Sequence, residues 1–222
     1  MSIISMIDLI RRRPGMFLGS NSISALRNFL DGYQAAEREH AIYYQAEELF
    51  PLPFGYMHEY AAYRLRNRNS MGWSHQILYS CNGVEDVALE KFFEFYDGFI
   101  RVRMRRYWKA ILTEDNIAWN DQMKGAYRCI GRNTSGFGLY TMDDLSEREP
   151  IYRNPLAAYV IELTIPVCIL AVETVTDIRL ERWFFPSPEK AQKSTKSYFG
   201  SIDSWEEITA RNISFDKNII MR

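Results

Sequence analysis

Two kinds of hydrophobic periodicity divide this chain. Over about the first 105 residues, apolar side chains recur at steps of three and four, as from Val84 through Phe92 to Phe99, which is typical of amphipathic helices. After about residue 125 they gather in short runs rich in β-branched and aromatic residues, such as CILAVET at 168–174, which indicates strands. The sequence therefore predicts an α+β fold, with a helical N-terminal half packed against a mainly antiparallel, β-rich C-terminal half.

The same patterns place the individual elements. Helices are predicted at 3–12, 23–38, 54–66, from about 71, at 84–104, at 107–119, and after a Ser187 cap. Strands are predicted at 127–130, 137–141, 158–165, 168–174, 178–185 and 213–220. We expect a helical region at 1–107 and a β-rich region with one or two helices at 108–222. Because the junction has no Gly/Ser/Pro-rich run, one continuous domain is the alternative.

Composition excludes several classes of function. The net charge of −1 gives no overall attraction to nucleic acid or to an anionic membrane. The three cysteines build neither a disulfide framework nor a zinc-binding spacing. No run approaches the ~20 apolar residues of a membrane span, and no secretory signal is visible. We find no catalytic constellation, so we expect a cytoplasmic protein that is not an enzyme, with no metal and no cofactor. The oligomeric state stays open.

The segment RRRPGMFLGS at 11–20 combines residues that interrupt helices, namely proline and glycine, with apolar residues. Pro14 disfavours helical geometry at Arg13, and Pro14-Gly15 fits the centre of a type II turn, where glycine supplies a positive φ. We expect the apolar residues 16–18 to insert into the core and Gly19 to mark the next break. The predicted role of Arg13, Pro14, Gly15 and Gly19 is structural. A β-branched residue at position 15 should then cost ~1–3 kcal/mol of stability.

The basic run RVRMRRYWK at 101–109 is the strongest charge feature. It contains four arginines and a lysine around two aromatic residues, namely Arg101, Arg103, Arg105, Arg106 and Lys109 with Tyr107 and Trp108. We interpret the run as a solvent-exposed face at the C-terminal end of the helix predicted at 84–104, where positive side chains interact favourably with the helix dipole. The alternative is a nucleic-acid- or nucleotide-binding surface, because such aromatic side chains stack on bases in single-strand binders.

The segment Arg13–Gly19 resembles the start of the ATPase domain of type II topoisomerases, which reads Arg-Pro-Gly-Met-Tyr-Ile-Gly. That family also needs an Asp-x-Gly-x-Gly motif for adenine, and this chain has none. The glycine cluster GRNTSGFG at 131–138 lacks the Lys-Ser/Thr of a phosphate loop. ATP hydrolysis on either template is therefore not expected.

A wider pattern covers about residues 8–100. The segments RPGMFLGSNSISALRNFLDGY, LPFGYMHEYAAYRL, GWSHQIL and ALEKFFEFYDGF are together similar to small bacterial immunity proteins encoded beside polymorphic toxins of the contact-dependent inhibition and Rhs type. The resemblance implies a protein that neutralises a cognate toxin domain by tight non-covalent binding and occlusion. A basic toxin would favour an acidic docking loop, for which the candidates are Asp143, Asp144, Glu147 and Glu149.

Overall fold

The computed structural model describes residues 3–39, 50–67, 71–122, 152–181, 183–208 and 218–221. Its contacts divide the chain into two compact units, Met1–Arg103 and Met104–Arg222. The described part of the first unit contains helices alone, and every described strand belongs to the second unit. The predicted α+β class is therefore confirmed. The division falls where the first strand begins, and the boundary predicted at residue 107 lies inside that strand. None of the described helices has the length and apolar character needed to cross a membrane.

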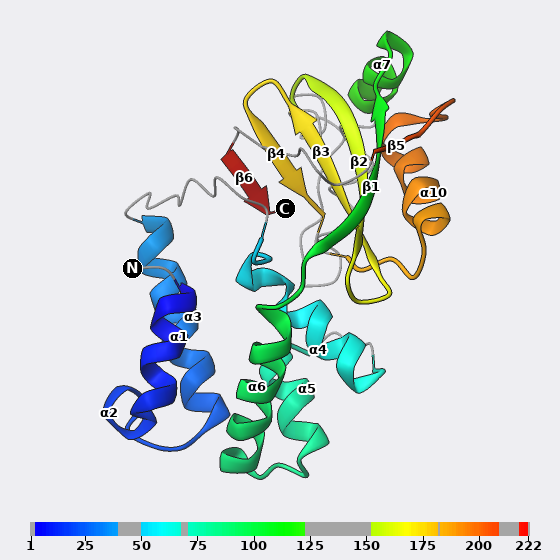
Figure 1. Ribbon diagram of the computed structural model, residues 1–222. Coiled ribbons are helices and arrows are strands. Elements are labelled where there is room, and N and C mark those ends of the chain that lie inside the picture. The colour runs from blue at the N-terminus through cyan, green and yellow to red at the C-terminus, as the bar shows by residue number, and fades with distance from the viewer. Residues whose placement is uncertain are drawn as a thin grey trace, which may run out of the picture. The chain divides into compact units, whose positions relative to one another are not determined.

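The first unit is a set of short helices (Figure 1). Their bounds are α1 Ile3–Arg12, α2 Pro14–Leu18, α3 Ile23–Glu39, the 3-10 turn η1 Phe54–Tyr56, α4 Met57–Leu65, α5 Trp73–Ser80 and α6 Glu85–Phe99. Ser22 caps α3, because its hydroxyl accepts a hydrogen bond of 3.1 Å from the Ala25 amide. The predicted helices at 3–12, 23–38 and 54–66 thus agree with the structure to within a turn.

Helix α6 supplies the core of this unit. Phe92, Tyr96 and Phe99 have no exposed surface, as their spacing of three and four residues predicts. The Phe92 ring lies 4.8 Å from the Trp73 ring of α5, and the Phe99 ring lies 5.5 Å from the Tyr60 ring of α4. Burial of these aromatic side chains is therefore what holds α4 and α5 onto α6.

Polar contacts attach the N-terminal helices to α6. Arg11 of α1 donates two hydrogen bonds to the carboxylate of Asp97, at 2.5 and 2.7 Å. The Glu85 carboxylate accepts hydrogen bonds from the Ser22 and Ser24 hydroxyls and from the Ser24 amide, at the first turn of α3. A carboxylate in this position satisfies amide hydrogens that the helix itself leaves unpaired, and it complements the helix dipole.

The second unit is built on a six-stranded sheet in the order β5-β1-β2-β3-β4-β6. The strands are β1 Met104–Ile111, β2 Pro155–Leu163, β3 Cys168–Thr174, β4 Asp177–Leu180, β5 Glu206–Ile208 and β6 Asn218–Met221. All neighbours pair antiparallel except β4 and β6, which are parallel. The predicted mainly antiparallel sheet is thus confirmed, and β3 has the predicted bounds.

One helix covers a face of this sheet, and a second helix packs against the first. Helix α10, Pro188–Phe199, packs on β2, β3 and α7, which spans Glu114–Gln122 (Figure 1). The Ser187 hydroxyl accepts a hydrogen bond from the Lys190 amide, so the predicted cap of α10 is confirmed. The core beneath α10 contains fully buried Val160, Leu170 and Ala191.

Two predicted elements are wrong at the junction of the units. The helix predicted at 84–104 ends at Phe99, and the helical piece predicted at 107–119 is strand β1 as far as Ile111 and becomes helical only from Glu114, in α7. The side chains of 106–110 alternate between the two faces of the sheet, and β2 pairs with the whole length of β1. Pairing with β2 therefore overrides the helical preference of the arginine-rich run, because sheet formation depends on such non-local partners.

Candidate functional site

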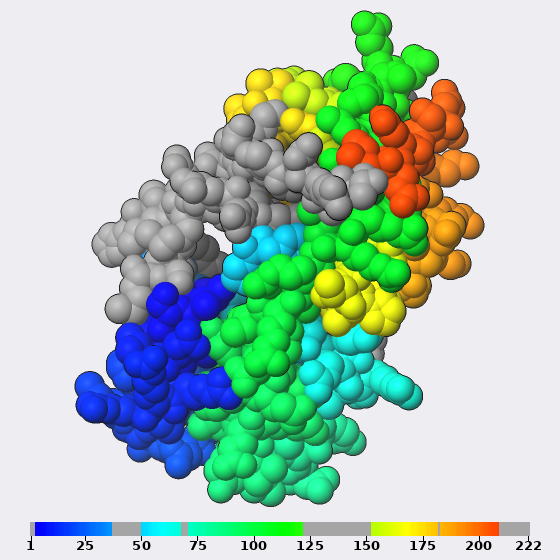
Figure 2. Space-filling view, in the orientation of Figure 1, coloured from blue at the N-terminus to red at the C-terminus, as the bar shows by residue number. Residues whose placement is uncertain are grey.

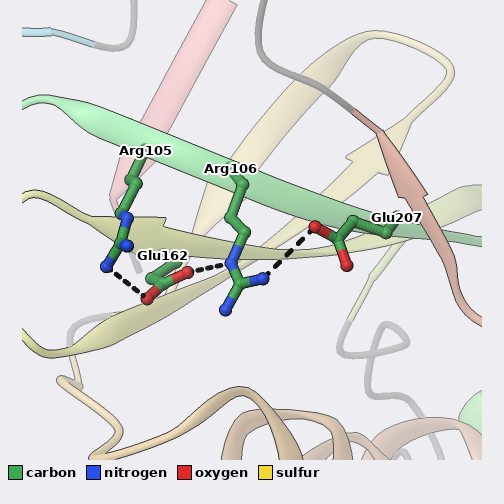
Figure 3. Close-up of polar contacts among 4 residues, drawn as sticks. All are labelled: Arg105, Arg106, Glu162 and Glu207. Atoms are coloured by element: carbon green, nitrogen blue, oxygen red, sulfur yellow. Dashed lines mark hydrogen bonds and ion pairs between the residues drawn. The ribbon is translucent and has the colours of Figure 1, made fainter.

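The basic run lies mainly on β1, and a β-bulge arranges its arginines. The register of β1 against β2 shifts between Met104 and Arg106, so Arg105 is an extra residue in the ladder. As a result, two consecutive arginines reach the same carboxylate (Figure 3). Arg106 Nε donates to Glu162, and Arg105 Nη1 lies 3.4 Å from the other carboxylate oxygen. The hydrogen bond to Glu162 raises the pKa of Arg106.

The aromatic residues of the run lie against the sheet and its helix. Tyr107 is buried, with its ring 6.1 Å from that of Tyr159. Trp108 packs against the cluster beneath α10, and the Arg106 guanidinium lies 4.9 Å from its ring. A surface that stacks on bases needs accessible ring faces. These two rings are committed to internal packing, which argues against the predicted nucleic-acid alternative.

The charges of Arg105, Arg106 and Lys109 are also engaged within the second unit. Arg106 Nη1 lies 3.3 Å from a carboxylate oxygen of Glu207 on β5. Lys109 Nζ lies 3.9 Å from Glu173, and the Tyr159 hydroxyl donates to that same carboxylate at 2.5 Å. Burial and this hydrogen bond raise the pKa of Tyr159. The cationic groups thus tie β1 to its neighbouring strands β2 and β5, and across β2 to β3.

The turn predicted at Pro14-Gly15 is wrong. These residues begin α2, with Pro14 at its first position and Arg13 as its N-cap. Gly15 therefore has helical geometry, and the positive φ of 72° belongs to Gly19, which caps the C-terminus of α2. The segment does not insert into the core either, because α2 has no buried residue and Met16 is 71% exposed. A proline suits both a turn and the first helical position, so the sequence alone does not separate the two.

The structure adds an apolar groove that the sequence did not indicate. It is an open groove of about 420 Å³ on α5, lined by Met71, His75, Leu78, Tyr79, Asn82 and Gly83. Tyr79 is 76% exposed and Met71 is 49% exposed. Leu78 lines this groove, whereas Trp73 and Ile77 are buried. Exposed apolar side chains that gather around a hollow are typical of a binding surface.

The remaining candidates divide between described and undescribed residues. The predicted acidic loop with Asp143, Asp144, Glu147 and Glu149 lies outside the described residues. Within the described ranges, no group of three or more His, Cys, Asp or Glu side chains is placed to hold a metal ion. Cys168 is buried beside β2, and this burial raises the pKa of its thiol to about 12. Such a thiol is a poor nucleophile at neutral pH.

Comparisons of this protein with family models, with curated proteins and with solved structures return no match.

Proposed function

We propose that this protein is a bacterial immunity protein that neutralises a cognate toxin domain by tight, non-covalent binding. The observation that carries the proposal is the groove on α5, where Met71 and Tyr79 project from the helical unit. Tyrosine and methionine are enriched at protein–protein interfaces. The groove belongs to the unit Met1–Arg103, which also contains the 8–100 region that resembles immunity proteins.

The proposed mechanism is occlusion of the toxin. A side chain of the toxin enters the groove, Tyr79 and Met71 exclude water around it, and the bound chain covers a surface that the toxin needs. The acidic residues Asp143, Asp144, Glu147 and Glu149 are proposed to steer a basic toxin during encounter. The mechanism requires no cofactor and no bond-breaking step, and it places the protein in the cytoplasm.

Co-expression with the product of the adjacent gene tests this proposal. We expect that product to arrest growth when produced alone, and we expect this chain to restore growth and to co-purify with it. Met71→Ala should weaken co-purification, while Met16→Ala should not. The two variants make the same chemical change at exposed positions, but Met16 lies on α2, outside the groove. A harmless neighbour, or a toxic one that never co-purifies, would exclude the proposal.

A further inference from the structure

The side chain of Gln76 connects the groove on α5 to the neighbouring helix α4. Gln76 is 2% exposed. Its Nε2 donates a hydrogen bond of 2.9 Å to the backbone carbonyl of Met71, which lines the groove, and lies 3.3 Å from Nδ1 of His58 on α4. Figure 2 shows the atoms of α4 (cyan) and α5 (teal) side by side on one face of the helical unit. One buried amide thus holds Met71 and contacts His58 at the same time.

The Met71 carbonyl fixes the direction of both hydrogen bonds. A carbonyl oxygen accepts and never donates, so the amide atom of Gln76 that faces it is the nitrogen. Toward His58 this nitrogen is again the donor, so Nδ1 of His58 accepts and carries no hydrogen. The hydrogen of the neutral ring is then on Nε2, which lies 3.9 Å from the Glu59 carboxylate. The arrangement therefore requires neutral His58 in a single tautomer.

Protonation of His58 conflicts with this arrangement. The imidazolium carries a hydrogen on both ring nitrogens, so Nδ1–H would point at an N–H of Gln76. Rotation of the amide removes the conflict, because Gln76 Oε1, which is buried without a hydrogen-bond partner, would then accept from the charged ring. Such a charge-assisted hydrogen bond is stronger than the neutral one that it replaces. The same rotation turns an oxygen toward the Met71 carbonyl, so Met71 loses its attachment to Gln76.

Glu59 keeps the protonated ring in place. Glu59 is 5% exposed, and the Nε2 that it faces carries a hydrogen in both protonation states of His58. The rearrangement therefore falls to Gln76. The other charged groups of α5 and α6, which pack on α4, are engaged elsewhere: His75 lines the groove, Glu85 accepts from Ser22 and Ser24, Asp86 accepts from the Val87 amide, Glu90 is exposed, Lys91 lies over Phe95, Glu94 pairs with Arg64 and Asp97 pairs with Arg11.

We propose that His58 controls the shape of the groove on α5 through the amide of Gln76. Neutral His58 holds Met71 against α5, where its side chain forms part of the groove wall. Protonated His58 takes the Gln76 oxygen and releases Met71, so the groove loses that wall as the pH falls through the range of about 8 to 5 in which histidine titrates. As a regulation of toxin binding, the proposal rests on the proposed function, but the coupling itself is measured without a partner.

Nuclear magnetic resonance of the full chain tests the tautomer and the coupling. At about pH 8 the nitrogen-15 spectrum of the histidine side chains should show His58 with its hydrogen on Nε2 and none on Nδ1. This reading uses the wild-type chain, so it needs no variant. On titration to about pH 5, the methyl resonance of Met71 should shift with the midpoint of the His58 ring. The Met16 methyl, which is exposed on α2, should not follow that midpoint.

Two asparagine variants separate His58 from the histidine that lines the groove. In His58→Asn, an amide oxygen takes the place of Nδ1 and accepts from Gln76 at every pH, so the shift of the Met71 methyl should be lost. His75→Asn makes the same change on the groove side of α5 and should keep that shift, with the midpoint of His58.

Three results would overturn the proposal. They are a hydrogen on Nδ1 of neutral His58, a Met71 methyl that does not titrate with His58, and a Met71 shift that survives in His58→Asn or disappears in His75→Asn. The absence of any toxin that binds this protein would remove the proposed function and leave these measurements unchanged, so the two failures are distinguishable.

Discussion

Two glycines of the same segment should respond to alanine with opposite signs. Gly15 lies in the first turn of α2, and a Cβ built there meets no atom within 4 Å. Alanine at this position should stabilise the protein by about 0.5–1 kcal/mol, because it lowers the backbone entropy lost on folding. Gly19 has a φ of 72° and donates its amide hydrogen to the Gly15 carbonyl at 3.1 Å. Alanine there should cost about 1–2 kcal/mol.

Urea denaturation followed by far-ultraviolet circular dichroism measures both changes, because the first unit carries most of the helix in the described residues. The two variants should differ by about 2 kcal/mol in the free energy of unfolding, from the gain of up to ~1 at Gly15 and the cost of at least ~1 at Gly19. The sign is decisive, since a type II turn at Pro14-Gly15 requires the reverse order. If Gly15→Ala proves the more destabilising variant, the assignment of α2 as a helix is refuted.

Three further perturbations follow from the packing and the charges. Phe92→Ala removes a fully buried ring in contact with Trp73, so thermal denaturation should show a loss of about 3–5 kcal/mol. Tyr152→Phe removes the buried hydroxyl that donates to Glu181, which should cost about 1–3 kcal/mol in urea, because the carboxylate stays buried without that donor. Burial raises the pKa of Glu85, but hydrogen bonds from Ser24 and Ser22 outweigh this and lower it below its usual value of 4.5. The contribution of Glu85 to stability is therefore present above pH 4.5 and lost as the pH falls through the lowered pKa. In Glu85→Gln, the free energy of unfolding should therefore fall less steeply as the pH is lowered below 4.5.

Phe92→Ala and Tyr152→Phe each have a matched control. Val87→Ala shortens a 49% exposed side chain on the same helix as Phe92 and should change stability by less than about 0.5 kcal/mol. Tyr79→Phe removes a hydroxyl from a largely exposed side chain and should leave stability unchanged. Two results would contradict the contacts assigned to these groups. One is a Glu85→Gln variant whose stability falls at low pH as steeply as that of the wild type. The other is a loss of stability in Tyr79→Phe as large as that in Tyr152→Phe.

The parts of the fold that local patterns encode could be predicted from the sequence. The spacing of Phe92, Phe95 and Phe99 indicated the buried face of α6, and Ser187 followed by Pro188 indicated the start of α10. Both signals arise from interactions within a few residues of the chain. The run CILAVET gave the bounds of β3 because its residues are buried almost without interruption.

Apart from the turn at Pro14-Gly15, where proline fits two local geometries, the errors lie where distant partners decide the structure. Strand β1 depends on pairing with β2, some fifty residues later, and the arginines that obscure its alternation are explained by Glu162 and Glu207. The three-residue strand β5 has too few side chains to give a pattern of its own. The groove on α5 was missed because helical spacing assigns Ile77 to the buried face and Tyr79 to the exposed face, but leaves Leu78 at the border between the two.

Calorimetric titration of the adjacent gene's product with this protein tests the central claim most directly. The claim is that the exposed surface of the helical unit binds a protein partner through the groove on α5. The account predicts saturable 1:1 binding that Tyr79→Ala weakens by tenfold or more, the loss expected for an aromatic side chain at the centre of an interface, while Met16→Ala binds like the wild type. Binding that is absent, or that Tyr79→Ala leaves unchanged, would contradict the account.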